Sequence, residues 1–284
     1  MSMFLPFHQV DVFAPGPLPG NPLAVVHDAD ALSDRQMQAF ANWTNLSETT
    51  FLLAPTSGEA DYRLRIFTPT RELPFAGHPT LGSAHAWLEA GGRPAHRETI
   101  TQESASGLVA LRRSADRISF AAPPLVRDEQ ADEKTLCSIT ELLGADASRI
   151  EAARWIDNGP GWVGIVFKSA DDVLGLKPQM AEIAKSGFKI GVAGFFDHSG
   201  APADLEVRAF GSGDGSSEDP VTGSLNAGFA QWLIRDGRAP RSYVARQGTV
   251  LGRGGMIHVE KKGEDVWIGG ATRTIISGTM RPLA

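Results

Sequence analysis

Residues 62–92 read YRLRIFTPTRELPFAGHPTLGSAHAWLEAGG, and this stretch decides the fold. Apolar and basic residues alternate over 62–67, which predicts a half-buried strand. A polar loop interrupted by prolines follows over 68–75, and a short apolar helix is expected from residue 79 to about residue 89. The glycine pair 91–92 would end that helix. The stretch therefore predicts a strand, a loop, a helix and a glycine stop, in that order.

The second half of the chain repeats this order at a separation of 141 positions. The matching residues are Pro79, Gly82, Ser83 and Ala86 in the first half and Pro220, Gly223, Ser224 and Ala227 in the second. Residues 203–208 lie at the same separation from 62–67 and also have a strand pattern. Chance similarity of two helix starts rich in glycine and alanine is the alternative explanation. We favour an internal duplication, which predicts two similar domains related by a pseudo-twofold axis.

The remaining patterns contain many strands and few long helices. Ser33 and Gln36 have the spacing of a capping box and predict a helix that ends near residues 43–45. Further helices are expected over 133–143, 178–186 and 222–235, and strands over 4–12, 49–53, 97–103, 106–113, 117–121, 150–156, 162–168, 188–196, 204–210 and within 243–280. The fold class is therefore α+β and not a doubly wound sheet. Residues 121–130 have the composition of a connector, so we expect one domain of 1–124 plus 272–284 and a second of 125–271.

The composition limits the possible functions. The 284 residues include 27 Lys and Arg against 33 Asp and Glu, a net charge of −6, and no stretch is dense in basic residues. This balance argues against a nucleic-acid-binding protein.

No apolar run approaches the roughly 20 residues of a membrane span, and the first residues lack the basic segment of a signal peptide, so we expect a cytoplasmic protein with no membrane partner. The single cysteine, Cys137, excludes an intramolecular disulfide and a multi-cysteine zinc site, and its helix pattern predicts a buried position.

Two polar residues occupy equivalent places in the repeat. His78 and Asp219 each stand directly before a proline that would open a helix, so both are expected at helix N-caps. Two such N-termini facing each other across a cleft would offer backbone N–H groups to an anion. The ligand implied is a small carboxylate held between the domains. Plain capping, or a loop histidine with satisfied hydrogen bonds, is the alternative for each residue taken singly.

Four motifs in order resemble a known family. They are VDVFA at 10–14 with GNPLAVV at 20–26, NLSETTF at 45–51, FTPTRELPFAGHPTLG at 67–82, and EDPVTGS at 218–224. Together they resemble the PhzF-like phenazine-biosynthesis isomerase family, which has a diaminopimelate-epimerase-like fold, over nearly the whole chain. The resemblance implies two similar domains, each a curled mixed sheet around a central helix. It also implies a homodimer and no metal or organic cofactor.

The resemblance also assigns roles to individual residues. It places the catalytic glutamate at Glu48 and two further polar active-site residues at His78 and Asp219. The positions it implies for substrate binding are Gly77, Gly223 and Ser224. The two glycines would let backbone N–H groups approach the substrate carboxylate, and the serine would shape the site near the aspartate.

The reaction that the resemblance implies is a proton relocation between two carbons of a small unsaturated acid. Such a step needs one base that then acts as the acid, with a pKa raised towards neutrality. Glu48 lies in an apolar stretch and is the expected proton shuttle, with His78 and Asp219 binding and polarising the substrate. A surface glutamate at a strand entry is the alternative for Glu48. The diaminopimelate-epimerase relatives of the family use two cysteines, one in each half. At the corresponding positions this chain has Ala76 or Gly77 and Asp219, so racemisation by two cysteines is not expected.

The other sequence patterns give weaker indications of a functional site. The loop 211–219 lacks the spacing of a dinucleotide fingerprint and is expected to be flexible, with the role of a lid as one option. Residues 252–255 have the pattern of a hairpin turn. Trp155 and Trp162 flank the loop 158–161. We expect the two tryptophans to pack in a core or turn, with a stacking platform as the alternative, and the loop has the option of forming part of the cleft wall. No spacing predicts a metal site.

Three functions therefore remain open. The leading one is a cofactor-independent isomerase acting on a small carboxylate. A true dihydro-hydroxyanthranilate isomerase is a narrower version that the motifs do not decide. The third, from another class, is a non-catalytic small-carboxylate-binding or regulatory protein that retains the fold.

Overall fold

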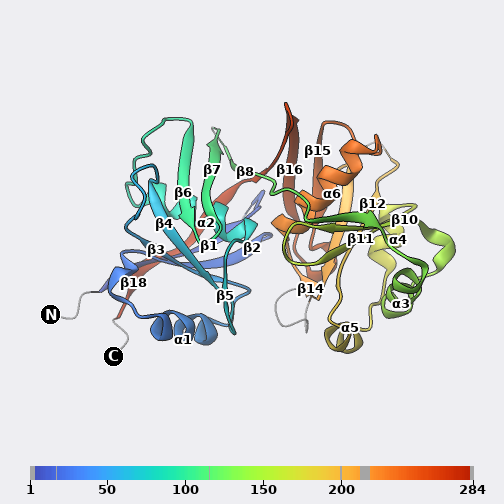
Figure 1. The fold of residues 1–284 in the computed structure, drawn as a ribbon, viewed down its shortest axis with the longest axis horizontal. Helices are drawn as coiled ribbons and strands as arrows, with labels where there is room; N and C mark the ends of the chain where they lie inside the picture. Colours follow the sequence, from blue (N-terminus) through green and yellow to red (C-terminus); the bar gives the residue numbers. More distant parts are fainter. Residues whose placement is uncertain (1–3, 17, 115, 199, 212–217, 282–284) are drawn as a thin grey trace. The chain divides into compact units, whose positions relative to one another are not determined.

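A computed structural model describes residues 4–16, 18–114, 116–198, 200–211 and 218–281. The contacts between residues divide the chain into two compact units. Unit 1 contains residues 1–121 and 269–284, and unit 2 contains residues 122–268. In Figure 1 the colours from blue to green, together with the last red strand, mark unit 1, and the colours from green to brown mark unit 2.

Both units consist mainly of strands. The elements of unit 1 are β1 (Leu5–Val12), β2 (Asn21–Val26), α1 (Asp34–Thr44), β3 (Thr49–Leu53), β4 (Tyr62–Phe67), β5 (Glu72–Leu73), α2 (Gly77–Glu89), β6 (Thr99–Ser104), β7 (Gly107–Arg113), β8 (Ile118–Ala121) and β18 (Thr272–Met280). Those of unit 2 are β9 (Arg127–Gln130), α3 (Glu133–Leu143), β10 (Ile150–Asp157), β11 (Trp162–Phe167), α4 (Ala170–Gly175), α5 (Met180–Ser186), β12 (Lys189–Phe195), β13 (Leu205–Phe210), β14 (Glu218–Asp219), α6 (Gly223–Arg235), β15 (Ser242–Gln247), β16 (Gly255–Lys262) and β17 (Asp265–Gly270), which ends in unit 1.

The two units repeat the same order of strand pairings. In unit 1, β1–β2 is antiparallel, β2–β3 parallel, β3–β4 antiparallel, β4–β6 parallel and β6–β7 antiparallel. In unit 2, β10–β11 is antiparallel, β11–β12 parallel, β12–β13 antiparallel, β13–β15 parallel and β15–β16 antiparallel. The short strands β5 and β14 pair with β4 and β13 in the same way. Each unit is thus a mixed sheet with the same connections.

One helix in each unit is buried on almost all sides. Nine of the thirteen residues of α2, and nine of the thirteen residues of α6, are buried. The helix α2 contacts β1, β2, β3, β4, β8 and β18, so the sheet of unit 1 curls around it. Glycines allow this close approach: a Cβ atom at Gly82 would lie 2.6 Å from Leu23, and one at Gly191 would lie 2.2 Å from Leu225 of α6. Small residues therefore let each central helix pack tightly against its strands.

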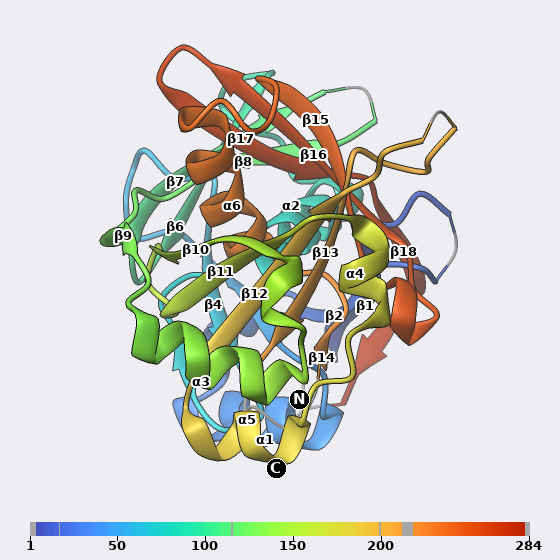
Figure 2. The same ribbon diagram turned by 90° about the vertical axis from the view of Figure 1, so that its right-hand side faces the viewer.

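The other face of each sheet carries the amphipathic helices. In unit 1, Met37 and Phe40 of α1 pack with Phe51 and Phe67. As the sequence predicts, the capping box of Ser33 and Gln36 is present and α1 ends within residues 43–45. Its C-cap, Asn45, is in the left-handed region at φ 53°. In unit 2, side chains of α3, α4 and α5 form one core with β11, β12 and β13. Figure 2 looks onto the side of unit 2 that carries these three helices.

Three sequence expectations in unit 2 need correction. Residues 127–130, expected as part of a connector, form the edge strand β9. The helix α4 was not expected. Cys137, expected to be buried, is exposed. The buried residues of α3 are Ile139 and Leu143, and a residue two positions before Ile139 lies about 200° away around the helix, so Cys137 faces outwards.

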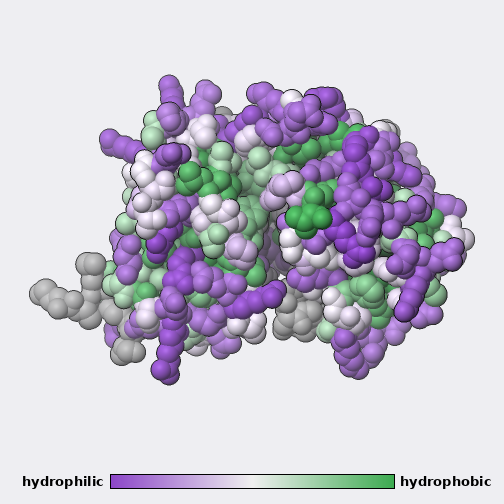
Figure 3. Space-filling view, in the orientation of Figure 1, coloured by the Kyte–Doolittle hydropathy of each residue, from purple (hydrophilic) through white to green (hydrophobic). Residues whose placement is uncertain are grey.

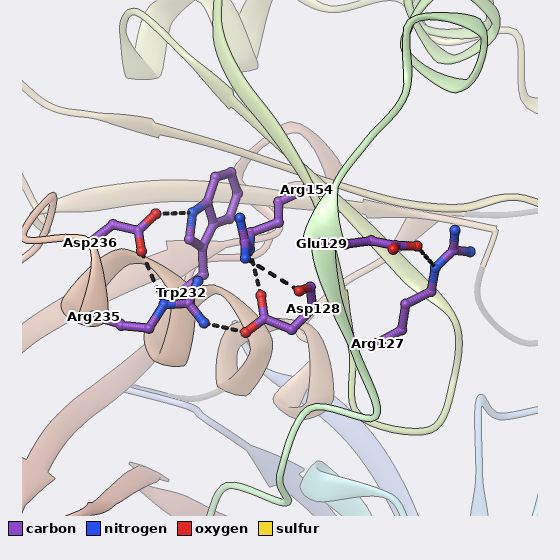
Figure 4. Close-up of polar contacts among 7 residues, drawn as sticks. All are labelled: Arg127, Asp128, Glu129, Arg154, Trp232, Arg235 and Asp236. Atoms are coloured by element: carbon purple, nitrogen blue, oxygen red, sulfur yellow. Dashed lines mark hydrogen bonds and ion pairs between the residues drawn. The ribbon is translucent and has the colours of Figure 1, made fainter.

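An ion-pair cluster attaches β9 to its neighbours. Asp128 of β9 accepts hydrogen bonds from Arg154 of β10 and from Arg235, the last residue of α6 (Figure 4). Asp236 at the C-terminal end of α6 accepts from Arg235 and from the indole N–H of Trp232. All residues of β9 are polar and exposed, so the strand is held by these ion pairs and by its pairing with β10. Its sequence has no apolar pattern from which a strand could have been predicted.

The surface agrees with the composition. Hydrophilic side chains cover most of the face seen in Figure 3, and hydrophobic ones form separate patches. Among the residues that the structure describes, no helix has both the length and the apolar character needed to cross a membrane.

Candidate functional site

Glu48 lies where the chain enters β3, three residues after the end of α1 at Asn45. The parallel pair β2–β3 joins Ala24 to Thr49, so the start of β2 and the start of β3 lie at the same end of the sheet. Asn21 is the first residue of β2 and is completely buried. The Glu48 side chain is 16% exposed, so it is largely covered and still reaches solvent.

His78 joins these two residues. It is the second residue of α2 and is buried. Its Nε2 atom lies 3.4 Å from Oε2 of Glu48, and its Nδ1 atom lies 3.4 Å from Nδ2 of Asn21. Burial lowers the pKa of His78 from 6.5 to about 3, because the charged ring would lose its hydration. The imidazole is therefore neutral at physiological pH.

The contact with Asn21 decides where the neutral ring carries its proton. With the amide nitrogen of Asn21 as donor, Nδ1 is an acceptor, and the single ring proton is on Nε2. This nitrogen lies 3.4 Å from Oε2 of Glu48, in a close contact that does not have the geometry of a hydrogen bond. The group of Asn21, Glu48 and His78 thus holds a carboxylate next to a neutral N–H donor, which is an arrangement suited to proton transfer.

The structure corrects the expected N-cap positions. The helix α2 begins at Gly77, with Ala76 as its N-cap, so His78 lies inside the first turn. The helix α6 begins at Gly223, with Thr222 as its N-cap, so Asp219 lies before the helix, in β14. The repeat is thus out of step by five residues at this point, because α2 starts two residues before its proline and α6 starts three residues after the corresponding one.

The glycines that we expected to bind a carboxylate have equivalent positions. Gly77 and Gly223 are the first residues of α2 and α6. Neither helix has a side-chain cap among the described residues. In α1, α3 and α4, by contrast, a first-turn N–H group donates to the side chain of Ser33, Asp132 and Ser169 respectively. Helix N-terminal N–H groups without a side-chain cap can bind an anion.

Asp219 is held by the turn that leads into α6. Its Oδ2 atom accepts a hydrogen bond of 2.6 Å from the hydroxyl of Thr222. The completely buried side chain of Gln247, from β15, donates to the carbonyl oxygen of Asp219 at 2.9 Å. The preceding residue, Glu218, forms a buried ion pair with Arg208 of β13. Asp219 therefore has a fixed backbone and a fixed carboxylate oxygen.

Ser224 also has a defined orientation. The indole N–H of Trp162 donates to its hydroxyl oxygen at 3.0 Å, and the amide of Asn158 donates to its carbonyl oxygen at 2.8 Å. Because an indole N–H can only donate, the Ser224 hydroxyl keeps its own proton for another acceptor. Trp162, expected to pack in a core or turn, and Asn158 from the loop beside it thus both contact a candidate site residue directly.

The predicted residues fall into two groups. Glu48, Gly77 and His78 lie together in unit 1. Asp219, Gly223 and Ser224 lie within six residues of one another in unit 2. The expectation that both groups act on one substrate stays a prediction. Of the loop 211–219, residues 212–217 lie outside the described part of the chain.

Sequence reasoning did not single out three residues of these groups. Asn21 and Thr222 stand inside the motifs GNPLAVV and EDPVTGS, so the motifs could have indicated them. Gln247 has no local signal, since it reaches Thr222 only because β15 pairs in parallel with β13. Within the described residues, no group of three or more His, Cys, Asp or Glu side chains is placed to hold a metal ion.

Comparisons with known proteins agree with the motifs. Residues 10–279 match the family described as "Phenazine biosynthesis-like protein" (PhzC-PhzF). The chain is 38% identical to "Antisense-enhancing sequence 1" of Schizosaccharomyces pombe over 96% of this chain and 97% of that protein. It is 34% identical to trans-2,3-dihydro-3-hydroxyanthranilate isomerase of Pseudomonas fluorescens over 95% of this chain and 94% of that one. A crystal structure of a PhzF-family phenazine biosynthesis protein from Enterococcus faecalis matches with a TM-score of 0.82 at 28% identity, covering 99% of this chain and 100% of that chain. The expected fold class is confirmed.

Proposed function

This chain is an isomerase of the phenazine biosynthesis-like protein family, and from that premise we propose that it relocates a proton on a small unsaturated carboxylic acid. In the proposed reaction, the Glu48 carboxylate removes a proton from one carbon of the substrate. The resulting carboxylic acid then delivers the proton to another carbon. No organic cofactor takes part.

The observation that carries this proposal is the contact between Glu48 and His78. A base that takes a proton from carbon must be positioned and partly shielded from water, and Glu48 is 16% exposed. Since burial keeps His78 neutral, the ring places no positive charge beside the carboxylate. The Nε2–H group of His78 can instead donate a hydrogen bond to the substrate oxygen that gains negative charge as the substrate loses its proton.

The start of α2 supports a carboxylate as the recognised group. Gly77 is its first helical residue, and the helix has no side-chain cap among the described residues. We assign the substrate carboxylate to these N–H groups, next to Glu48 and His78. We assign Asp219, Gly223 and Ser224 to the same reaction, where Asp219 would polarise the substrate and the other two would bind it.

The experiment is proton NMR in D2O with trans-2,3-dihydro-3-hydroxyanthranilate, the substrate named for the Pseudomonas fluorescens relative. The wild type should exchange a carbon-bound proton for deuterium or form the isomer. Glu48→Gln keeps the shape of the side chain and removes the base, so exchange should fall by at least about a thousandfold. Glu59→Gln, at an exposed glutamate of the same unit, should match the wild type.

Each result has a separate meaning. Exchange by the wild type that persists in Glu48→Gln would contradict the proposed base. No exchange with this compound, followed by exchange with another unsaturated acid from a panel, would change the substrate and retain the mechanism. Binding without exchange over the whole panel would favour the non-catalytic carboxylate-binding alternative. The homodimer implied by the resemblance and the cytoplasmic location expected from the sequence stay predictions, and sedimentation velocity tests the first.

A further inference from the structure

The hydroxyl of Thr222 occupies an unusual position for a helix-capping residue. Thr222 is the N-cap of α6, where a threonine side chain normally accepts a hydrogen bond from the first-turn N–H groups. Here the side chain makes no such bond. It contacts Oδ2 of Asp219 and Nε2 of Gln247 instead. The ordinary capping role of this threonine has been exchanged for contacts with a candidate catalytic residue.

The orientation of the Gln247 amide follows from its backbone partners. Its Oε1 atom lies 3.0 Å from the backbone N–H of Thr222, which can only donate. Its Nε2 atom lies 2.9 Å from the backbone carbonyl oxygen of Asp219, which can only accept. Asn226 also donates to Oε1, at 2.9 Å. Three partners thus agree on which end of the amide is oxygen and which is nitrogen.

That orientation fixes the direction of the next hydrogen bond. The second Nε2 hydrogen of Gln247 points to Oγ1 of Thr222 at 2.9 Å, so the threonine oxygen is the acceptor in this contact. The single proton of the hydroxyl is then directed to Oδ2 of Asp219 at 2.6 Å. A hydrogen bond of this length to a carboxylate is typical of a charge-assisted bond.

We propose that Thr222 and Gln247 are positioning residues for Asp219: Gln247 orients the Thr222 hydroxyl, and that hydroxyl holds the Asp219 carboxylate in the orientation that the isomerisation requires. The inference rests on the proposed role of Asp219. Thr222 and Gln247 are buried, and their hydrogen bonds to Asp219 are already present without substrate, so no reorganisation is needed during the reaction.

Unit 1 offers a matched control. Gln102 of β6 is also completely buried, and its Nε2 atom donates to the hydroxyl of Thr80 in the first turn of α2 at 3.2 Å. No hydrogen bond between Thr80 and His78 is present in the described structure. Thr80→Val therefore removes the same kind of buried glutamine–threonine contact without touching a carboxylate.

The test compares Thr222→Val, Thr222→Ser, Asp219→Asn and Thr80→Val, each checked for folding by circular dichroism and thermal unfolding. Turnover is followed by NMR with trans-2,3-dihydro-3-hydroxyanthranilate. Thr222→Val should lower kcat/KM by about tenfold or more, mainly through kcat, because it removes one hydrogen bond to a charged group. Thr222→Ser retains the hydroxyl and should stay within about twofold of the wild type. Thr80→Val should lose stability and keep the single orientation of the Asp219 carboxylate.

Equal losses in Thr222→Ser and Thr222→Val, or wild-type kcat in Thr222→Val, would overturn the inference. If Asp219→Asn itself has wild-type turnover, the proposed role of Asp219 fails instead. Crystal structures of Thr222→Val and Thr222→Ser provide a readout that does not need turnover. The Asp219 carboxylate should rotate or occupy more than one orientation in the valine variant and keep one orientation in the serine variant. An unchanged carboxylate in the valine variant would also overturn the inference.

Discussion

Arg208 and Glu218 form a bidentate ion pair in which the two side chains are only 3% and 8% exposed. The Nε and Nη2 atoms of Arg208 donate to the two carboxylate oxygens of Glu218 at 2.9 and 2.8 Å. The remaining nitrogen, Nη1, donates to the carbonyl oxygens of Val173 and Leu176 at 3.1 and 2.9 Å. One guanidinium thus connects β13, β14 and the end of α4, directly beside Asp219.

Breaking this pair from one side should destabilise the protein strongly. Glu218→Gln leaves the Arg208 charge buried without its partner, and we expect the free energy of unfolding to fall by about 3–5 kcal/mol. Replacing both residues by methionine removes both charges and should restore much of that loss. Urea unfolding of Arg208→Met, Glu218→Met and the double methionine variant measures this coupling. Additive losses would contradict a direct interaction.

The hydrogen bond from Trp162 to Ser224 should affect substrate binding. Trp162→Phe removes the indole N–H and some buried volume, with an expected loss of about 1–2 kcal/mol in stability. If Ser224 binds substrate, KM should rise several-fold, because the serine hydroxyl becomes free to rotate. Trp232→Phe is the matched control, since Trp232 is also buried and donates its indole N–H at the other end of α6, to Asp236. It should lose similar stability at constant KM, and equal KM values for the two variants would refute the effect.

Acid should destabilise unit 1 through a buried histidine pair. His8 and His27 lie 2.9 Å apart between Nδ1 and Nε2. Burial, and then the neighbouring His8, lower the pKa of His27 from 6.5 to about 4, although Asp28 acts in the opposite direction. The folded pKa is below the unfolded one, so the unfolded chain binds more protons between pH 6.5 and 4. The free energy of unfolding therefore falls as the pH decreases through this window, by about 3 kcal/mol at pH 4.

Urea titrations at pH 7, 5.5 and 4 measure this dependence. His27→Gln cannot titrate and should show a smaller decrease towards pH 4 than the wild type. The remaining slope includes His78, whose lowered pKa acts in the same direction. His96→Gln, at an exposed histidine, should keep the wild-type slope. An unchanged slope in His27→Gln would show that His27 is not neutral and buried in the folded state.

The exposed position of Cys137 predicts a reactive thiol. Native protein should react with one equivalent of 5,5′-dithiobis(2-nitrobenzoic acid) per chain without denaturant, because Cys137 is exposed and is the single cysteine. Cys137→Ser should show no reaction and unchanged stability. A thiol that reacts only in denaturant would restore the sequence-based expectation of a buried side chain.

Much of the secondary structure could be predicted because it follows from local periodicity. The alternation in YRLRIF gives β4 with its bounds, and the pattern over 133–143 gives α3 with its bounds. The errors arise where local pattern is weak. The edge strand β9 has only polar residues, and α4 has only six residues, which is less than two helical turns. For Cys137, the helix was predicted correctly and the buried face was assigned wrongly.

The sequence by itself determined the family and most of the order of strands and helices, and it singled out Glu48, His78 and Asp219 as candidates, because motifs and periodicity are properties of short segments. Only the tertiary structure decided that α2 includes His78 while α6 starts after Asp219, since packing against the sheet selects where each helix begins. It also decided the partners of these residues. Gln247 is 25 positions after Thr222 in the chain and reaches it through the parallel pairing of β15 with β13, and such a register depends on the whole sheet.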